Sequence, residues 1–151
     1  MDTNTNQTTN VNNIMYQYNE ALIKRRNKVT KEIKEELIPK YLKNGITSIE
    51  LHYDGCGDSG EMTEAIASNK NNEIITDTSE EGKNLNIYED WSEVCYDLLT
   101  YDWYNNEGGG GVIYIDLENM EIEVDGYYNT TQQVTPDNSE QQTHFNLNEI
   151  I

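Results

Sequence analysis

An alternating pattern of apolar and polar residues in the C-terminal half of the chain constrains the fold more than any other feature. On either side of Glu118 and Asn119 every second residue is apolar, and these residues are Ile113, Ile115, Leu117, Met120, Ile122 and Val124. A period of two is typical of a strand with one buried face. A two-residue turn would pair 117 with 120, 115 with 122 and 113 with 124. The pattern therefore predicts an antiparallel hairpin, whose opposite face carries Asp116, Glu121, Glu123 and Asp125.

Two further segments have the spacing of amphipathic helices. Between residues 14 and 42, apolar residues recur at spacings of four or seven with charged residues between them. We expect Pro39 to end or kink this helix and Gly45 to stop it. Residues 89–104 form a second predicted helix, in which Asp90 and Glu93 resemble a capping box. Its apolar stripe consists of Trp91, Val94, Cys95, Leu98 and Leu99.

A second alternating segment precedes a glycine-rich acidic turn. Ile49, Leu51 and Tyr53 share one face of a strand predicted over residues 46–53, which leads into the turn at 54–61. Residues 62–67 favour another strand, and residues 68–86 are mostly polar, which indicates a loop. The four consecutive glycines within residues 105–111 indicate a flexible connection into the hairpin.

These elements predict one α+β domain. The expected architecture is a small antiparallel sheet of three or four strands with two helices packed on one face, over residues 14–128. Residues 1–13 are polar and offer almost nothing to bury, so we expect a disordered tail there. Residues 129–151 form a polar C-terminal tail, also expected to be disordered, with a candidate docking segment at 144–151. A length of 151 residues fits this single domain.

The net charge of −18 is distributed unevenly along the chain. Residues 1–43 hold eight cations and five acids, whereas residues 44–151 hold two cations and twenty-three acids. Such a body repels nucleic acid and attracts basic surfaces, although acidity that only maintains solubility is an equal alternative. No apolar run is long enough to span a membrane. The N-terminus has no secretory pattern and two cysteines form no disulfide framework, so we expect a soluble cytoplasmic protein.

The glycine-rich turn allows several interpretations. Its candidate residues for a ligand or a turn are Asp54, Gly55, Gly57, Asp58, Ser59, Gly60 and Glu61. The order Gly-Asp-Ser-Gly resembles a serine-protease nucleophile loop, but no histidine base and aspartate are suitably arranged around Ser59. The three carboxylates could hold Mg²⁺ or Ca²⁺, although their spacing is not that of an EF-hand, and the backbone could form an anion nest. A tight turn with glycines at positive φ is the leading interpretation.

Aromatic residues cluster in sequence near the hairpin. Exposed tyrosine and tryptophan among acids is typical of a protein–protein contact surface. The predicted partner-binding residues are Tyr114, Asp116, Glu121, Glu123, Asp125, Trp103 and Tyr127. They favour a non-enzymatic binding protein without a cofactor, whose partner is a basic, nucleic-acid-binding host protein that it inhibits or masks. The alternatives are a small-ligand or divalent-metal site at residues 54–61 and, less favoured, direct nucleic-acid binding through residues 24–43.

Two blocks of sequence resemble a family of short bacterial and phage proteins known only as a domain of unknown function. The first is IELHYDGCGDSGEM at 49–62, and the second is WYNNEGGGGVIYID at 103–116, in which Tyr104 and the four-glycine run depart from the usual spelling. The resemblance covers residues 28–128. It implies a compact domain of phage or mobile-element origin and carries over no catalytic residue.

Overall fold

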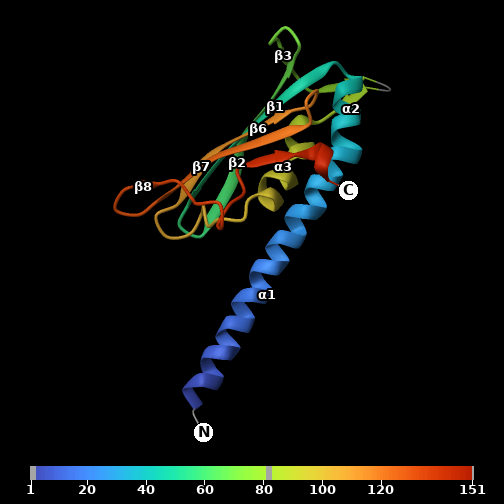
Figure 1. Ribbon diagram of the computed structural model, residues 1–151. Helices are drawn as coiled ribbons and strands as arrows, with labels where there is room; N and C mark the ends of the chain where they lie inside the picture. The colour runs from blue at the N-terminus through green and yellow to red at the C-terminus, as the bar shows by residue number, and fades with distance from the viewer. Residues whose placement is uncertain (1–2, 81–82, 151) are drawn as a thin grey trace.

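The computed structural model describes residues 3–80 and 83–150 and has an α+β architecture (Figure 1). A long N-terminal helix leads into a sheet that is crossed on one side by a shorter helix. The elements are α1 (Thr3–Glu32), η1 (Ile33–Leu37), α2 (Ile38–Lys43), β1 (Ile46–Cys56), β2 (Ser59–Asn69), β3 (Ile74–Ile75), β4 (Thr78–Glu80), β5 (Lys83–Leu85), α3 (Ile87–Leu98), β6 (Gly109–Asp116), β7 (Glu121–Asn129), β8 (Gln133–Val134), β9 (His144–Asn146) and η2 (Leu147–Glu149).

The main sheet has seven strands, more than the three or four that the sequence predicts. Its order is β3-β2-β1-β6-β7-β8, and β9 also pairs with β7. All pairings in it are antiparallel. The additional strands β3, β8 and β9 have two or three residues each. Such short strands have too few residues to show an alternating pattern, which is why the segments that contain them resemble loops.

The predicted hairpin forms with the expected register but a longer turn. Ile113 pairs with Val124 and Ile115 with Ile122, and the last pair of the ladder is Asp116 with Glu121. Residues 117–120 therefore make a four-residue turn, in which Met120 has a φ of 58°. The prediction of a two-residue turn is wrong here, because Leu117 leaves the ladder and is fully buried in the core.

Both helical layers cover the same face of the sheet, as predicted. Ile49 and Leu51 of β1 and Ile113 of β6 are almost completely inaccessible to solvent. They form one core with residues of the helices, among which Trp91 and Leu98 come from α3. The hydrophobic side of the sheet is closed in this way, and the other side carries mostly polar residues.

The first helix is longer than predicted. Its backbone is helical from Thr3, so the disordered tail expected at 1–13 is corrected over its described residues, while residues 1 and 2 lie outside them. Once a helix exists, each further residue adds a hydrogen bond, and an apolar side chain is not required for this. Pro39 does not end the helix. The five-residue π-helix η1 precedes it and α2 continues to Lys43, after which Gly45 has a φ of 80° and ends the helical segment.

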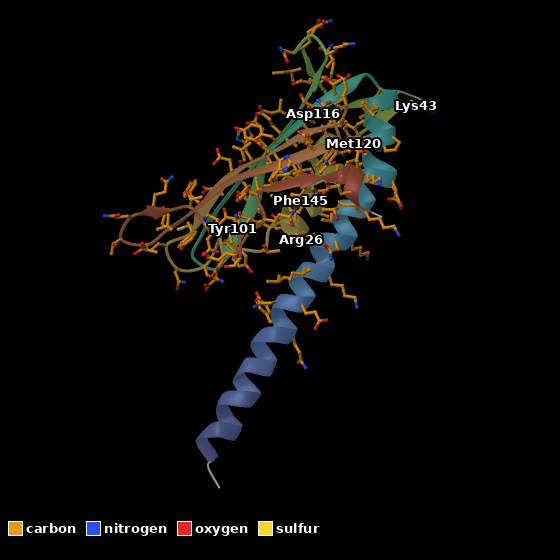
Figure 2. All side chains as sticks on the ribbon, viewed as in Figure 1. Arg26, Lys43, Tyr101, Asp116, Met120 and Phe145 are labelled. Carbon is orange, nitrogen blue, oxygen red and sulfur yellow. The ribbon has the colours of Figure 1, made fainter. Side chains whose placement is uncertain are left out.

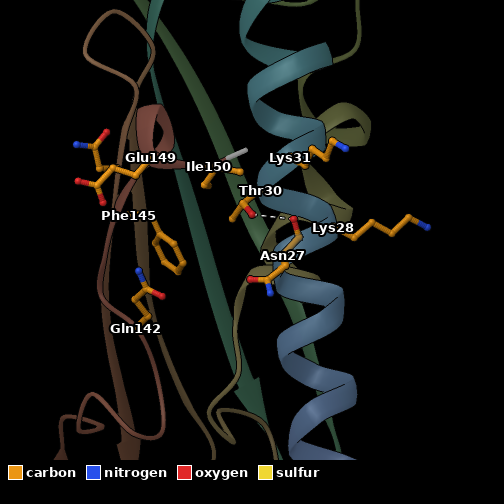
Figure 3. A pocket seen from close by; sticks show the side chains of 9 residues that line it. Asn27, Lys28, Thr30, Lys31, Gln142, Phe145, Glu149 and Ile150 are labelled. Atoms are coloured by element: carbon orange, nitrogen blue, oxygen red, sulfur yellow. Dashed lines mark hydrogen bonds between the residues drawn. The ribbon is translucent and has the colours of Figure 1, made fainter.

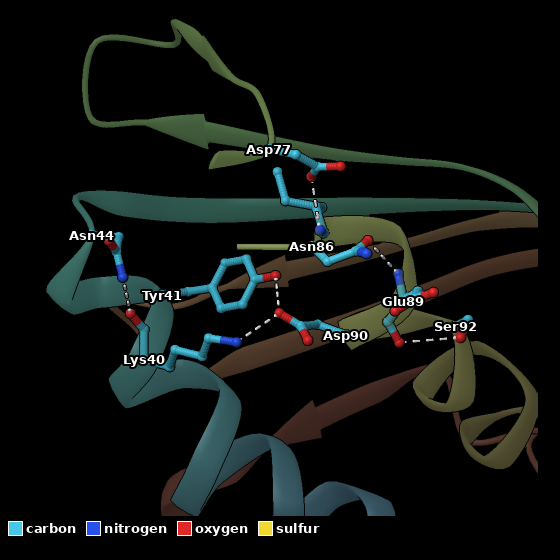
Figure 4. A network of polar contacts seen from close by, with 9 residues as sticks. Lys40, Tyr41, Asn44, Asp77, Asn86, Glu89, Asp90 and Ser92 are labelled. Carbon is cyan, nitrogen blue, oxygen red and sulfur yellow. Dashed lines mark hydrogen bonds and ion pairs between the residues drawn. The ribbon is translucent and has the colours of Figure 1, made fainter. Parts of the chain in front are cut away.

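The second helix begins and ends earlier than expected. Asn86 is its N-cap and its side chain accepts a hydrogen bond from the Glu89 amide at 3.3 Å. Asp90 does not act in a capping box. Its Oδ2 accepts hydrogen bonds from the Tyr41 hydroxyl at 2.7 Å and from Lys40 Nζ at 3.0 Å (Figure 4). Asp90 thus links α3 to α2 through two hydrogen bonds.

The C-terminal segment belongs to the domain and is not a disordered tail. Strand β9 pairs with β7, and Phe145 and Leu147 are buried beside it. The candidate docking segment at 144–151 therefore packs on the sheet over its described residues, 144–150. The prediction from composition was wrong. Two apolar side chains are enough to order a polar segment when the unpaired edge of a sheet lies next to it.

The glycine run is also ordered. Gly109, Gly110 and Gly111 are part of β6 and pair with both β1 and β7. A Cβ at Gly109 would come within 2.3 Å of the Tyr127 carbonyl oxygen, and Gly108 has a φ of 77°. The glycines are therefore required by close backbone packing, and the prediction of a flexible connection is corrected.

Candidate functional site

The face of the sheet opposite the helices is strongly acidic, and we call it the outer face. The strand registers place Glu50 beside Tyr114, Tyr114 beside Glu123, and Asp116 beside Glu121. The carboxylates of the outer face are Glu50, Asp54, Glu61, Glu64, Asp116, Glu121, Glu123 and Asp125. Strands β1, β2, β6 and β7 contain no lysine or arginine. The outer face is thus strongly anionic, with Ile66, Val112 and Tyr114 between its carboxylates.

Six of the seven predicted partner-binding residues meet on this face. Glu121, Glu123 and Asp125 are exposed, and 42% of Tyr114 is accessible to solvent. Asp116 and Tyr127 are half-buried. This arrangement follows from the two-residue period of the strands, which places alternate residues on one side.

Trp103 does not belong to the outer face. Only 2% of it is exposed, and its ring packs edge-on against Tyr53 at a centroid distance of 5.0 Å. A Cβ at Gly60 would meet the same ring at 2.4 Å. Trp103 fills the space left by a glycine on the helix side of the sheet, so its assignment to the partner surface is wrong.

Carboxylates on neighbouring strands repel one another. Asp54 lies opposite Glu61 and Asp116 lies opposite Glu121, and like charges in directly opposed positions destabilise a sheet. Asp116 has partial compensation, because its Oδ2 accepts a hydrogen bond from Asn119 Nδ2 at 2.7 Å.

Both histidines of the chain lie at this face. His52 Nε2 is 3.2 Å from Glu50 Oε2, and His144 Nε2 is 4.0 Å from Glu121 Oε2. His144 comes from β9 and pairs with Glu123. Each imidazole thus lies beside a carboxylate of the outer face.

The turn at 54–61 is a tight hairpin between β1 and β2. Cys56 pairs with Ser59, which leaves Gly57 and Asp58 as the two turn residues, and Gly57 has a φ of 68°. Glycine with positive φ at the first of two turn positions is typical of a type II′ turn. Asp54 and Glu61 point to the outer face, whereas Asp58 is at the tip. Within residues 3–80 and 83–150, no group of three histidine, cysteine or acidic side chains is arranged to hold a metal ion.

A cavity of about 600 Å³ separates α1 from the C-terminal segment. Phe145 and Gln142 point into it, whereas Lys28 and Lys31 point away (Figure 3). The Arg26 guanidinium lies 5.7 Å from the centre of the Phe145 ring (Figure 2). Partial burial lowers the pKa of Arg26. The contact between Arg26 and Phe145 thus joins α1 to β9 beside the cavity.

We expect the two cysteines to differ in reactivity by more than about a hundredfold at pH 8. Cys56 is exposed in the turn, whereas Cys95 is buried in α3 and burial raises the pKa of its thiol to about 12. The reactive thiolate of Cys95 is therefore almost absent at pH 8. Labelling with a thiol reagent followed by peptide mass spectrometry measures both rates. Equal labelling of the folded protein at both positions would contradict the packing of α3.

No protein-family model, no curated protein and no solved structure matches this chain. The resemblance to a family of unknown function therefore stays a prediction. The two blocks that carry it do come together in space, because β1 and β6 pair from Ser48–Asp116 to Gly55–Gly109. Among the helices of residues 3–80 and 83–150, none combines the length and the apolar character that crossing a membrane requires.

Proposed function

We propose that this protein is a non-enzymatic cytoplasmic binding protein, of phage or mobile-element type, whose outer face covers the basic surface of a nucleic-acid-binding protein. The observation that carries the proposal is the outer face itself, where eight carboxylates occur in four strands that contain no lysine or arginine. Potentials of one sign over a rigid surface steer a partner of opposite charge and raise its association rate.

The geometry of a sheet suits this role. Side chains on neighbouring strands are ~4.8 Å apart and alternate residues of one strand ~6.8 Å apart. The outer face therefore displays closely spaced anions in fixed positions, as a nucleic-acid backbone displays phosphates, with about one charge per 1.7 Å of duplex axis. A protein that binds phosphates with lysine and arginine would find acceptors for the same side chains here.

Tyrosine side chains add contact area between the charges. Tyr114 lies between Glu50 and Glu123 at the centre of the face, and Tyr127 lies beyond Asp125 on β7. Tyrosine is enriched at protein interfaces because it buries a large ring and immobilises few bonds. We therefore expect Tyr114 to be the central contact of the complex.

Charge reversal on the outer face tests the proposal. We expect decalysine, used as a basic probe, to bind the wild-type protein with an affinity that falls at least about tenfold between about 50 mM and about 200 mM salt. The variant E121K/E123K should bind it about thirtyfold more weakly at low salt, because two attractions become repulsions. Isothermal titration calorimetry measures both affinities.

The matched control is E35K/E36K, which changes the net charge equally on exposed residues of η1. It should retain most of the affinity for decalysine. Equal losses in the two variants would show that net charge alone attracts the probe and would refute the outer face as the site. A nuclease-treated pull-down with wild-type and E121K/E123K protein would then name the partner, as a basic protein captured only by the former.

A further inference from the structure

A second cavity, which we call the tyrosine pocket, lies on the helix side of the β1–β2 turn. It has a volume of about 540 Å³ and is bordered by α1, the turn, α3 and the loop that follows α3. The side chains used in the argument are Tyr18, Tyr96, Trp103, Tyr104, Asp58 and Asp102. None of them is on the outer face, so the pocket is a separate site.

Three aromatic rings of the pocket, those of Tyr96, Trp103 and Tyr104, pack together. The centre of the Trp103 ring is 5.4 Å from that of Tyr104, in an edge-on contact, and 6.0 Å from that of Tyr96. The Tyr96 hydroxyl donates a hydrogen bond to the Gly60 carbonyl at 3.2 Å, which ties α3 to the turn. Tyr96 and Tyr18 remain largely exposed, at 43% and 61%. A rigid floor with accessible ring faces is therefore ready before any ligand arrives.

Two carboxylates border these rings without a cationic partner. Neither Asp58 nor Asp102 takes part in an ion pair among residues 3–80 and 83–150. Asp102 accepts hydrogen bonds from Asn105, at 3.1 Å from the amide and 3.3 Å from Nδ2, and a carboxylate has acceptor capacity beyond these two. Aromatic faces attract cations through their quadrupole, and carboxylates attract them directly.

We propose that the tyrosine pocket binds an arginine side chain of a partner protein. A guanidinium is planar, stacks on aromatic rings and offers a fork of donors to a carboxylate, whereas the ammonium of lysine is a compact hydrated charge. The pocket does not depend on the outer face. A partner that binds at the tip of the β1–β2 hairpin would nevertheless contact both the tyrosine pocket and the outer face.

Arg25 is the feature of the pocket that opposes a cation. It lies on the α1 wall, is exposed, and interacts electrostatically with Asp97 of α3. A pocket for an anion would use Arg25 as its main contact, whereas a pocket for arginine would bind better without it. Replacing Arg25 should therefore weaken the binding of an anion and strengthen the binding of arginine.

The experiment is an NMR titration of the whole chain with N-acetyl-arginine amide. N-acetyl-citrulline amide serves as the neutral isostere and inorganic phosphate as the anionic probe. We expect saturable shifts of the Trp103 indole N–H, with those of the fully buried Trp91 unchanged as an internal reference. Asp58→Asn should weaken arginine binding about fivefold, and Arg25→Gln should strengthen it about twofold. Both positions are exposed, so both variants should fold, as their spectra will show.

Several results would overturn the proposal. They are equal binding of the citrulline and arginine probes, weaker binding after Arg25→Gln together with phosphate binding, or no saturable shift at Trp103. The variant E121K/E123K separates this site from the outer face. Unchanged arginine binding in that variant would support the pocket even if decalysine binding proved unspecific. Loss of arginine binding would show that the net negative charge of the protein attracts the probe, and it would refute the pocket.

Discussion

Replacing Gln141 with leucine should lower the free energy of unfolding by about 3 kcal/mol, because backbone groups at the end of α3 and in the loop after it lose a hydrogen-bond partner. The side chain of Gln141 is completely buried. Its Oε1 accepts hydrogen bonds from the amides of Thr100 at 2.6 Å and Tyr101 at 3.3 Å. Its Nε2 donates to the carbonyl of Leu98, the last residue of α3, at 3.3 Å. Leucine has a similar volume but cannot satisfy any of these groups.

Gln142→Leu is the matched control. Gln142 is exposed, and its side chain donates only to the His144 carbonyl at 2.8 Å, so a change within about 0.5 kcal/mol is expected. Urea denaturation of both variants measures the difference, and amide hydrogen exchange at Thr100 reports whether the end of α3 has opened. Similar stabilities of the two variants would mean that Gln141 does not anchor the C-terminal segment.

Replacing Gly126 with alanine should destabilise the protein by about 3 kcal/mol or more, because overpacking forces neighbouring groups to move. A Cβ at this position would be 2.4 Å from the hydroxyl oxygens of both Tyr53 and Tyr101. These oxygens are fixed, because the two hydroxyls are hydrogen-bonded at 2.7 Å and Tyr101 donates to the Gly110 carbonyl at 3.0 Å. Burial raises the pKa of Tyr101 to about 12 and that of Tyr53 further above its usual range.

Two further variants test this explanation for Gly126. Gly57→Ala places its Cβ in open space and meets only the strain of a φ of 68°, so about 1 kcal/mol is expected. Gly126→Ala in a Tyr53→Phe background should cost less than the sum of the two single changes, since one of the two crowding oxygens is already gone. Thermal and urea unfolding of the four proteins complete the cycle. Strict additivity would show that the hydroxyls are not the obstacle.

Local patterns in the sequence were sufficient for the central hairpin and its charged face. The period of two in residues 113–124 specifies which side chains share a face, and this does not depend on the rest of the fold. Consequently Asp116, Glu121, Glu123 and Asp125 lie together as predicted. The stop at Gly45 is similarly local, because the left-handed backbone there favours glycine.

Only tertiary contacts decided where Trp103 and the glycine run lie. Trp103 and the glycine run are close in sequence to the acidic hairpin, which led to the prediction of an exposed tryptophan and a flexible connection. In the folded chain Trp103 occupies the space above Gly60, and Gly108 lies against the Gly55 carbonyl. These pairs are more than forty positions apart, so no local period or propensity can reveal them.

The sequence by itself determined the central hairpin and the charge of its outer face, because both follow from the order of neighbouring residues. The tertiary structure alone decided the extent of the sheet, the role of Gln141 and the assembly of the tyrosine pocket. Gln141 is polar in a polar segment, and its partner Thr100 is forty-one positions away. The pocket combines Tyr18, Asp58 and Tyr96 from three distant segments. Such sites arise when packing brings separate elements together. A buried polar group can then form its hydrogen bonds with residues that are distant in sequence.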